Sequence, residues 1–313
     1  MKVLFMGTPA FAAASLTRLL ESPHDVVGVV TRPDAPAGRG RAMRASAVKD
    51  IAVARGLPLM QPHRLKDPQL AAQLESLAPD LVVVVAYGRI LPEALLELAA
   101  RGAVNVHASL LPLYRGASPV AHAILHGEKE TGVTTMRMIA ALDAGDVLMQ
   151  RAIPISDDDT TATLEERLAL LGADLLIETL DALASGAVHP VPQDHDRATW
   201  APTLSKDDGR INWSLPAREL WLRVRAFDPW PGAWTRTPAG RQLRIWRARP
   251  AESSSAQAAA GTVVAVGVRK DDVEVAAGAG SLLLTQVQPE GGRRMPAMEA
   301  VSGRHLRVGD VLG

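Results

Sequence analysis

The chain has 313 residues, which at ordinary domain sizes predicts about two domains. Hydrophobic residues make up 47% of it and charged residues 22%, while 34 basic and 34 acidic residues cancel, so the net charge indicates no particular partner. The sequence contains no cysteine, which excludes disulfides, thiolate metal sites and cysteine nucleophiles.

Apolar runs are short throughout the chain. None approaches the ~20 residues that a membrane-spanning helix needs. The first run, Val3 to Met6, is also too short for the core of a signal peptide. We therefore expect a cytoplasmic protein that does not bind a membrane.

Strand and helix patterns alternate in the first 186 residues. Short β-branched runs occur at 2–6, 25–31, 57–60, 80–87 and 103–107. Helical apolar spacing occupies 10–22, 67–78, 92–101 and, as one long helix, 160–186. Apolar strands joined by helices predict an α/β domain with a parallel sheet covered on both faces.

The pattern changes near residue 187. Pro, Asp and His are scattered without periodicity over 187–210, which is typical of a linker. A helix at 214–227 and short strands between turn residues follow, and they predict a small barrel. The expected division is a catalytic domain at 1–189, a linker at 190–206 and a barrel domain at 207–313.

Asn105 and His107 stand two residues apart at the end of the run at 103–107. Alternation along a strand sends both side chains to the same side. Parallel sheets bind ligands beyond the carboxyl ends of their strands. An amide that donates hydrogen bonds, beside an imidazole that exchanges protons, suits the oxyanion of an acyl transfer. The alternative is a polar strand end that only satisfies the loop backbone.

The segment "MIAALDAGDVLMQ" offers two carboxylates, Asp143 and Asp146, in an Ala/Gly-rich turn. A carboxylate near an imidazole can orient the ring, although Asp beside Gly often serves only its own turn. The first strand–helix turn, "GTPAFA", lacks the G-x-G-x-x-G spacing, which disfavours a dinucleotide-dependent dehydrogenase. No histidine pairs with acidic residues at the helical spacing of a metal site, so we expect no metal.

A basic segment, 31–49, follows the second expected strand. Its basic residues outnumber the single Asp34: Arg32, Arg39, Arg41, Arg44 and Lys49. A flexible basic loop beside an active-site edge suits contact with a phosphate backbone, although it can equally be a solvated surface loop.

In this order, several motifs resemble the methionyl-tRNA formyltransferase family, whose members use 10-formyltetrahydrofolate. They are "MGTP", "RPDAPAGRG", "NVHASLLPLYRGASP", "LDAGD", "LSKDDGRINWSLPAREL" and "RAFDPWPGAW". The resemblance covers essentially the whole chain. It implies a Rossmann-like formyltransferase domain followed by an OB-like, tRNA-binding barrel. It also implies a catalytic trio of Asn105, His107 and Asp143, with Asp143 rather than Asp146 as the carboxylate.

The resemblance assigns further residues. Those expected to contact the folate are Ser109, Leu110, Leu111, Pro112, Tyr87, Gly88, Arg89, Ile90 and Leu91. For tRNA, the resemblance itself points to Arg39, and the basic character of the chain adds Arg41, Arg44, Lys49 and Lys206 as expected contacts. Further candidates on the basic barrel are Arg236, Arg241, Arg244, Arg247 and Arg249, near Trp234 and Trp246. The alternative for this stretch is an amphipathic strand with Trp in the core and Arg in solvent. The chain departs from the family at "MRASAVK", which lacks a Pro-rich run, and at "ALDAGD", which has Ala where Gly or Thr is frequent.

The expected reaction moves the formyl group of 10-formyltetrahydrofolate to the α-amino group of methionyl initiator tRNA, in a monomeric enzyme. The alternative is an N-formyltransferase acting on an amino sugar nucleotide. Such an enzyme would share the trio but would need neither the basic loop nor a basic barrel. A non-catalytic RNA-binding adaptor would leave the trio with no common purpose.

Overall fold

The computed structural model describes residues 1–37, 42–251, 258–267 and 271–313. These residues form two compact units. The first unit comprises Met1–Pro119, Glu130–Pro154 and Glu165–Pro202, and the second comprises Val120–Lys129, Ile155–Leu164 and Thr203–Gly313. No helix in the described part of the chain is both long and apolar enough to cross a bilayer.

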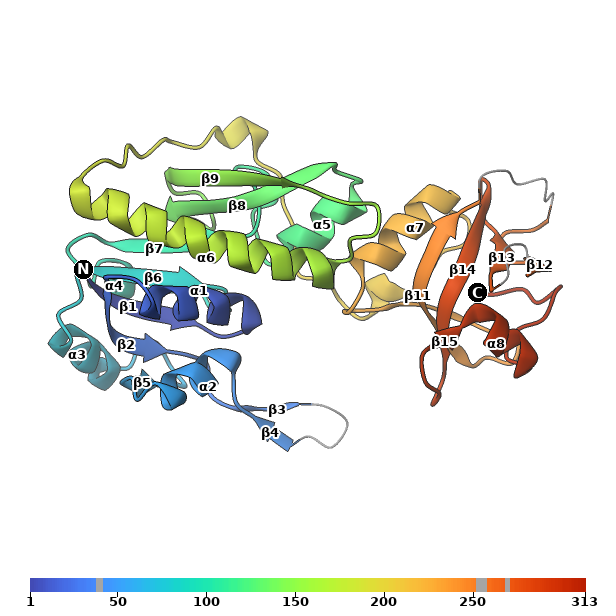
Figure 1. Ribbon diagram of the computed structural model, residues 1–313, viewed down its shortest axis with the longest axis horizontal. Coiled ribbons are helices and arrows are strands. Elements are labelled where there is room, and N and C mark those ends of the chain that lie inside the picture. Colours follow the sequence, from blue (N-terminus) through green and yellow to red (C-terminus); the bar gives the residue numbers. More distant parts are fainter. Residues whose placement is uncertain (38–41, 252–257, 268–270) are drawn as a thin grey trace. The chain divides into compact units, whose positions relative to one another are not determined.

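The first unit is built on a seven-stranded sheet in the order β5-β2-β1-β6-β7-β8-β9 (Figure 1). Its parallel strands are β1 (Lys2–Gly7), β2 (Asp25–Val30), β5 (Leu59–Met60), β6 (Leu81–Val85) and β7 (Ala103–His107). All five were predicted from their β-branched runs. Two antiparallel strands, β8 (Glu130–Arg137) and β9 (Val147–Pro154), extend the sheet and were not predicted.

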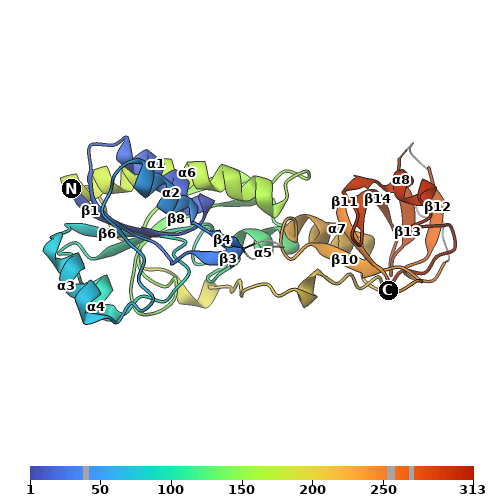
Figure 2. The same ribbon diagram turned by 90° about the horizontal axis from the view of Figure 1, so that it is seen from below.

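Helices cover both faces of this sheet. They are α1 (Ala10–Leu20), α2 (Ala47–Ala54), α3 (Pro68–Ser76), α4 (Glu93–Leu96) and the 25-residue α6 (Thr161–Ser185). Figure 2 shows α1 and α6 on one face and α3 and α4 on the other. A Cβ added to Gly172 of α6 would lie 3.0 Å from Val106 Cγ1, so the helix packs tightly against β7. Because Val106 faces α6, Asn105 and His107 project from the opposite face of the strand.

A buried apolar cluster fills the face under α3 and α4. It joins Leu4 and Val84 of the sheet to Leu74 of α3, and it includes Tyr87 and Leu91 from the segment that follows β6. Burial of this apolar area anchors the segment 87–91 at the carboxyl end of the sheet.

The second unit contains an antiparallel sheet in the order β10-β11-β14-β13-β12. These strands are β10 (Ala233–Arg236), β11 (Gln242–Pro250), β12 (Val263–Val266), β13 (Val273–Ala276) and β14 (Ser281–Pro289). Each lies within a predicted strand run, and α7 (Ala217–Ala226) is the predicted helix. The strand β15 (Met295–Pro296) and α8 (Ala297–Ser302) were not predicted. Most of α5 (Pro119–Leu125) also belongs to this unit.

Leu74→Ala tests the buried cluster of the first unit. Leu74 is fully buried, so the substitution should lower the free energy of unfolding by about 2–5 kcal/mol. The matched control is Leu170→Ala on α6, where the side chain is 66% exposed and a change within about 0.5 kcal/mol is expected. Urea unfolding followed by circular dichroism measures both. Equal losses would contradict this account of the core.

Candidate active site

Two polar side chains end β7 on the face away from α6. Asn105 is 9% exposed and His107 is 6% exposed. The strand pairs parallel with β6 and antiparallel with β8, which places His107 opposite Thr134. Two strong pairings therefore fix the direction of both side chains.

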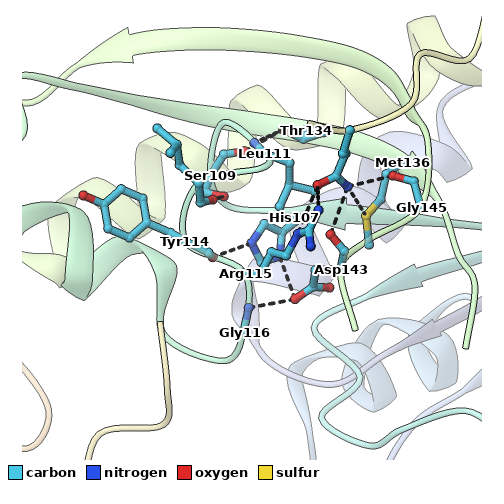
Figure 3. A network of polar contacts seen from close by, with 12 residues as sticks. His107, Ser109, Leu111, Tyr114, Arg115, Gly116, Thr134, Met136, Asp143 and Gly145 are labelled. Carbon is cyan, nitrogen blue, oxygen red and sulfur yellow. Dashed lines mark hydrogen bonds and ion pairs between the residues drawn. The ribbon is translucent and has the colours of Figure 1, made fainter. Parts of the chain in front are cut away.

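His107 lies between two acceptors, as Figure 3 shows. Its Nε2 is 3.0 Å from the carbonyl oxygen of Tyr114, and its Nδ1 is 3.7 Å from Oδ2 of Asp143. The ring is thereby held in one orientation at the strand end.

Asp143 is the carboxylate that meets His107. Its Oδ2 also accepts a hydrogen bond from the backbone N–H of Gly116 at 2.8 Å, and its side chain is only 11% exposed (Figure 3). Asp143 has φ +50°, in the left-handed region. This backbone conformation costs free energy, and it directs the carboxylate toward His107. Asp146 instead continues the sheet, because its carbonyl accepts the N–H of Arg137.

Thr134 holds the loop that follows His107. Its hydroxyl donates to the carbonyl of Ser109 at 2.6 Å and accepts the N–H of Leu111 at 3.1 Å. Gln150 Nε2 donates to the same hydroxyl and to the carbonyl of Leu111, at 2.9 and 2.7 Å. Ser109 Oγ donates to the carbonyl of Leu113 at 2.6 Å. Thr134 and Gln150 were not predicted from the sequence, because the strands β8 and β9 that carry them were not predicted and only their register places Thr134 opposite His107.

The apolar members of the same loop have their own supports. A Cβ on Gly132 would lie 2.5 Å from Leu110 Cδ2, so the glycine leaves room for that side chain. Leu111 is 4% exposed, and the peptide between it and Pro112 is cis. Hydrogen bonds and apolar packing thus fix the loop 109–112, which we call the rim, beside His107.

The segment 87–91 is anchored at both ends. Tyr87 and Leu91 are 2% and 6% exposed, whereas Ile90 is 85% exposed. Gly88 has φ +79°, and Arg89 donates to two carbonyls of the loop before α3. Burial raises the pKa of the Tyr87 hydroxyl, an effect that Arg89 partly opposes.

The segment 199–201, far away in the sequence, binds the backbone of Tyr114 and Arg115 beside the site. Thr199 accepts the N–H of Tyr114 on its side-chain oxygen at 2.8 Å and the N–H of Arg115 on its carbonyl at 2.9 Å. Ala201 donates to the carbonyl of Arg115 at 2.7 Å. Nothing in the sequence pattern of 187–210 indicated this pairing.

The comparisons with known proteins show the family of the chain. Residues 1–180 match the family model described as "Formyl transferase", and residues 203–305 match "Formyl transferase, C-terminal domain". The methionyl-tRNA formyltransferase of Symbiobacterium thermophilum is 50% identical over 309 residues, covering 99% of this chain and 94% of that protein. The chain belongs to the methionyl-tRNA formyltransferase family.

Two solved structures are similar in fold. The N-formyltransferase from Helicobacter canadensis, in complex with folinic acid and dTDP-3-aminofucose, gives a TM-score of 0.66 at 16% identity, over 91% of this chain and 98% of that one. HypX from Aquifex aeolicus in complex with tetrahydrofolic acid gives 0.64 at 19% identity. That match covers 98% of this chain, which spans about half (48%) of HypX.

The basic segment of this formyltransferase contains a short hairpin, formed by β3 (Ala35–Ala37) and β4 (Ala42–Arg44). Arg39 and Arg41 lie outside the described residues. Arg44 is exposed on β4, whereas Lys49 of α2 pairs with Asp34 at 2.6 Å. The hydrogen bond from Lys49 holds the pKa of the Asp34 carboxyl below its usual value.

A basic pocket of about 870 Å³ opens in the second unit of the formyltransferase, and we call it the arginine pocket. Five basic side chains line it, against the acidic Asp157 and Asp158, and two tryptophans form part of its wall. These basic and aromatic lining residues are Lys129, Arg218, Arg225, Arg247, Arg249, Trp221 and Trp246. Arg225 is only 7% exposed and braces the wall by donating to the carbonyls of Ser156 and Asp159.

The predicted barrel arginines have different neighbours. Arg247 and Arg249 line the arginine pocket, and Arg244 lies 5.8 Å from the ring centre of Trp246. Arg236 lies at the same distance from Trp234, whose indole N–H reaches the carbonyl of Lys206 at 3.4 Å. Arg241 is exposed. Within the described ranges, no group of three or more His, Asp or Glu residues is arranged to hold a metal.

The geometry distinguishes the two carboxylates of the turn. Asp143→Ala should lower the rate of formyl transfer by about 10²–10⁴, because His107 loses its charged neighbour and the site loses a proton acceptor. Asp146→Ala is the matched control and should retain most of the activity. Single-turnover assays with both variants measure the difference. Equal losses would mean that Asp143 has no special role.

Proposed function

We propose that the protein transfers the formyl group of 10-formyltetrahydrofolate to the α-amino group of methionine carried by initiator tRNA. The observation that carries this proposal is the buried arrangement of Asn105, His107 and Asp143 at the end of β7. The product is N-formylmethionyl-tRNA. Half of the residues are shared with a methionyl-tRNA formyltransferase over nearly the full chain, which supports this choice of acceptor.

The chemistry starts from the acceptor amine. An α-amine has a pKa of about 7.7–8.0, so a useful fraction is neutral and nucleophilic near neutral pH. It attacks the formyl carbon directly and forms a carbon–nitrogen bond and a tetrahedral oxyanion. Collapse then breaks the bond to the folate nitrogen, which takes up the proton that the amine has lost. This path requires no nucleophile from the protein.

Asn105 and His107 stabilise the oxyanion. The Asn105 amide donates a hydrogen bond to it, and the His107 ring, clamped between Tyr114 and Asp143, supplies positive charge beside it. Removing one such donor typically costs about 10²–10³ in rate. Asp143 also serves as the relay that accepts the amine proton through a water. Its carboxylate is fixed for that task by the N–H of Gly116.

The folate fits between two loops at the carboxyl end of the sheet. The rim 109–112, fixed by Thr134, would hold one side of the pteridine, and the segment 87–91 the other. The Tyr87 hydroxyl is buried and has no hydrogen-bond partner among the described residues, so a polar ligand would satisfy it. When bound, 10-formyltetrahydrofolate supplies the activated formyl group.

Two basic surfaces suit the tRNA. The first is the basic segment 31–49, in which Arg44 is exposed on β4 and Lys49 pairs with Asp34. Arg39 and Arg41 belong to the same segment of the sequence and lie outside the described residues. The second is the arginine pocket, with Lys206 as a further contact outside it. Phosphate contacts of this kind give affinity without reading sequence. We expect a monomer, since one chain supplies every part of this scheme. We also expect the enzyme in the cytoplasm, because its proposed product serves translation initiation.

A substrate assay tests the proposed function. The protein should formylate methionyl initiator tRNA when 10-formyltetrahydrofolate is supplied, and mass spectrometry of the released amino acid should show N-formylmethionine. The control replaces the tRNA with an amino sugar nucleotide. Transfer to the sugar nucleotide without transfer to the tRNA would overturn the proposal and favour the amino-sugar alternative.

The hairpin makes a separate prediction about salt. Replacing Arg39, Arg41 and Arg44 by Ser removes up to three phosphate contacts, so the slope of log affinity against log salt should fall by up to about 3. The control triple changes Arg55, Arg64 and Lys66, which are exposed in the same unit and remove the same charge. Filter binding at several salt concentrations compares them. An unchanged slope in the variant of the three arginines would contradict the tRNA contacts and favour the alternative, a solvated surface loop.

A further inference from the structure

Gln193 lies beside the proposed site in the segment that the sequence marked only as a linker. It is 7% exposed, and its side-chain amide uses every hydrogen-bonding position it has. Nε2 donates to the carbonyls of Asp143 and Gly145, at 2.9 and 2.7 Å. Oε1 accepts from Nε and Nη2 of Arg115, at 3.1 and 2.6 Å. Its orientation is therefore determined on both sides.

The donor side of Gln193 grips the loop that presents Asp143. Asp143 is in the left-handed region, and a Cβ on Gly145 would lie 1.9 Å from the carbonyl oxygen of Arg137. The loop is thus tightly packed, and its conformation is one that a non-glycine residue avoids when it is unsupported. The two donated hydrogen bonds occupy carbonyls that would otherwise be left buried without partners.

The acceptor side of Gln193 holds the residue before Gly116. Arg115 is 5% exposed, and its buried guanidinium needs acceptors, which are Gln193 Oε1 and Nδ1 of His195. The following residue, Gly116, donates the backbone hydrogen bond to the Asp143 carboxylate. One amide therefore links both supports of Asp143, namely its own backbone and the turn that binds its side chain.

We propose that Gln193, braced by Arg115, is a positioning residue that sets the Asp143 carboxylate against His107. It touches none of the reacting atoms and acts only through Asp143. This inference rests on the proposed function for its rate measurements. It also predicts that Gln193 affects the surroundings of the His107 ring, which can be measured in the absence of substrate.

The sharpest variant is Gln193→Glu. A glutamate keeps the shape and still accepts from Arg115, but it can no longer donate to the carbonyls of Asp143 and Gly145. A displacement of the carboxylate by about 1 Å can cost up to about 10²-fold in rate, so kcat should fall about 10- to 100-fold. The KM for each substrate should stay within about threefold of wild type. Gln73→Glu, the same change at an exposed position of α3, is the control and should leave kcat unchanged.

A double-mutant cycle separates positioning from general structural damage. If Gln193 acts through Asp143, then Gln193→Glu should cause no further loss in the Asp143→Ala background. An equal fold loss in both backgrounds, or full activity of the single variant, would overturn the proposal. If Gln193→Glu does not fold, as judged by circular dichroism, Gln193→Met removes the same donors without adding charge and takes its place.

A measurement without substrate completes the test. The ring resonances of His107, assigned in ¹⁵N-histidine-labelled protein by their loss in His107→Asn, should shift in Gln193→Glu and not in Gln73→Glu. Unchanged resonances would overturn the positioning role. If the wild-type protein formylates no methionyl-tRNA, the proposed function fails, and this measurement alone then decides the role of Gln193.

Discussion

The packing of α6 against β7 is the constraint on which the site depends. Gly172 lets the helix lie close to Val106, where an added Cβ would come within 3.0 Å of its Cγ1, and this contact occupies one face of the strand. Asn105 and His107 are therefore committed to the other face. On that face the antiparallel strand β8 brings Thr134 opposite His107, and the loops after both strands close over the pair. A helix–strand contact thus decides where the chemistry can take place.

The surrounding loops follow a rule about buried backbone. A site shielded from water leaves many N–H and C=O groups without solvent, and each needs a partner. Here short polar side chains supply those partners. Thr134 and Gln150 satisfy the rim at 109–111, Thr199 satisfies the turn after it, and Gln193 satisfies the Asp143 loop. The hydrogen bonds that satisfy these buried backbone groups also hold the loops of the site in place.

This division explains what the sequence could and could not predict. The five parallel strands consist mostly of apolar residues, and the spacing of Asn105 and His107 in one of them follows from strand alternation, so local patterns revealed both. The strands β8 and β9 carry Thr, Gln and Arg, which mask the apolar signal of a strand. Gln193 and Arg115 are 78 residues apart, and their hydrogen bonds depend on the whole fold rather than on any local pattern. The resemblance to a family named the trio but none of these supports.

The interleaving of the two units along the chain has a consequence for evolution and for protein engineering. The chain passes from one unit to the other after residues 119, 129, 154, 164 and 202, so neither unit is a continuous stretch of sequence. A recombination at any single point would separate parts that belong together. Arg225, for example, binds carbonyls at 156 and 159 that are encoded some seventy residues earlier. Substitutions in 120–129 or 155–164 can therefore alter the second unit, although the chain on either side of these segments belongs to the first.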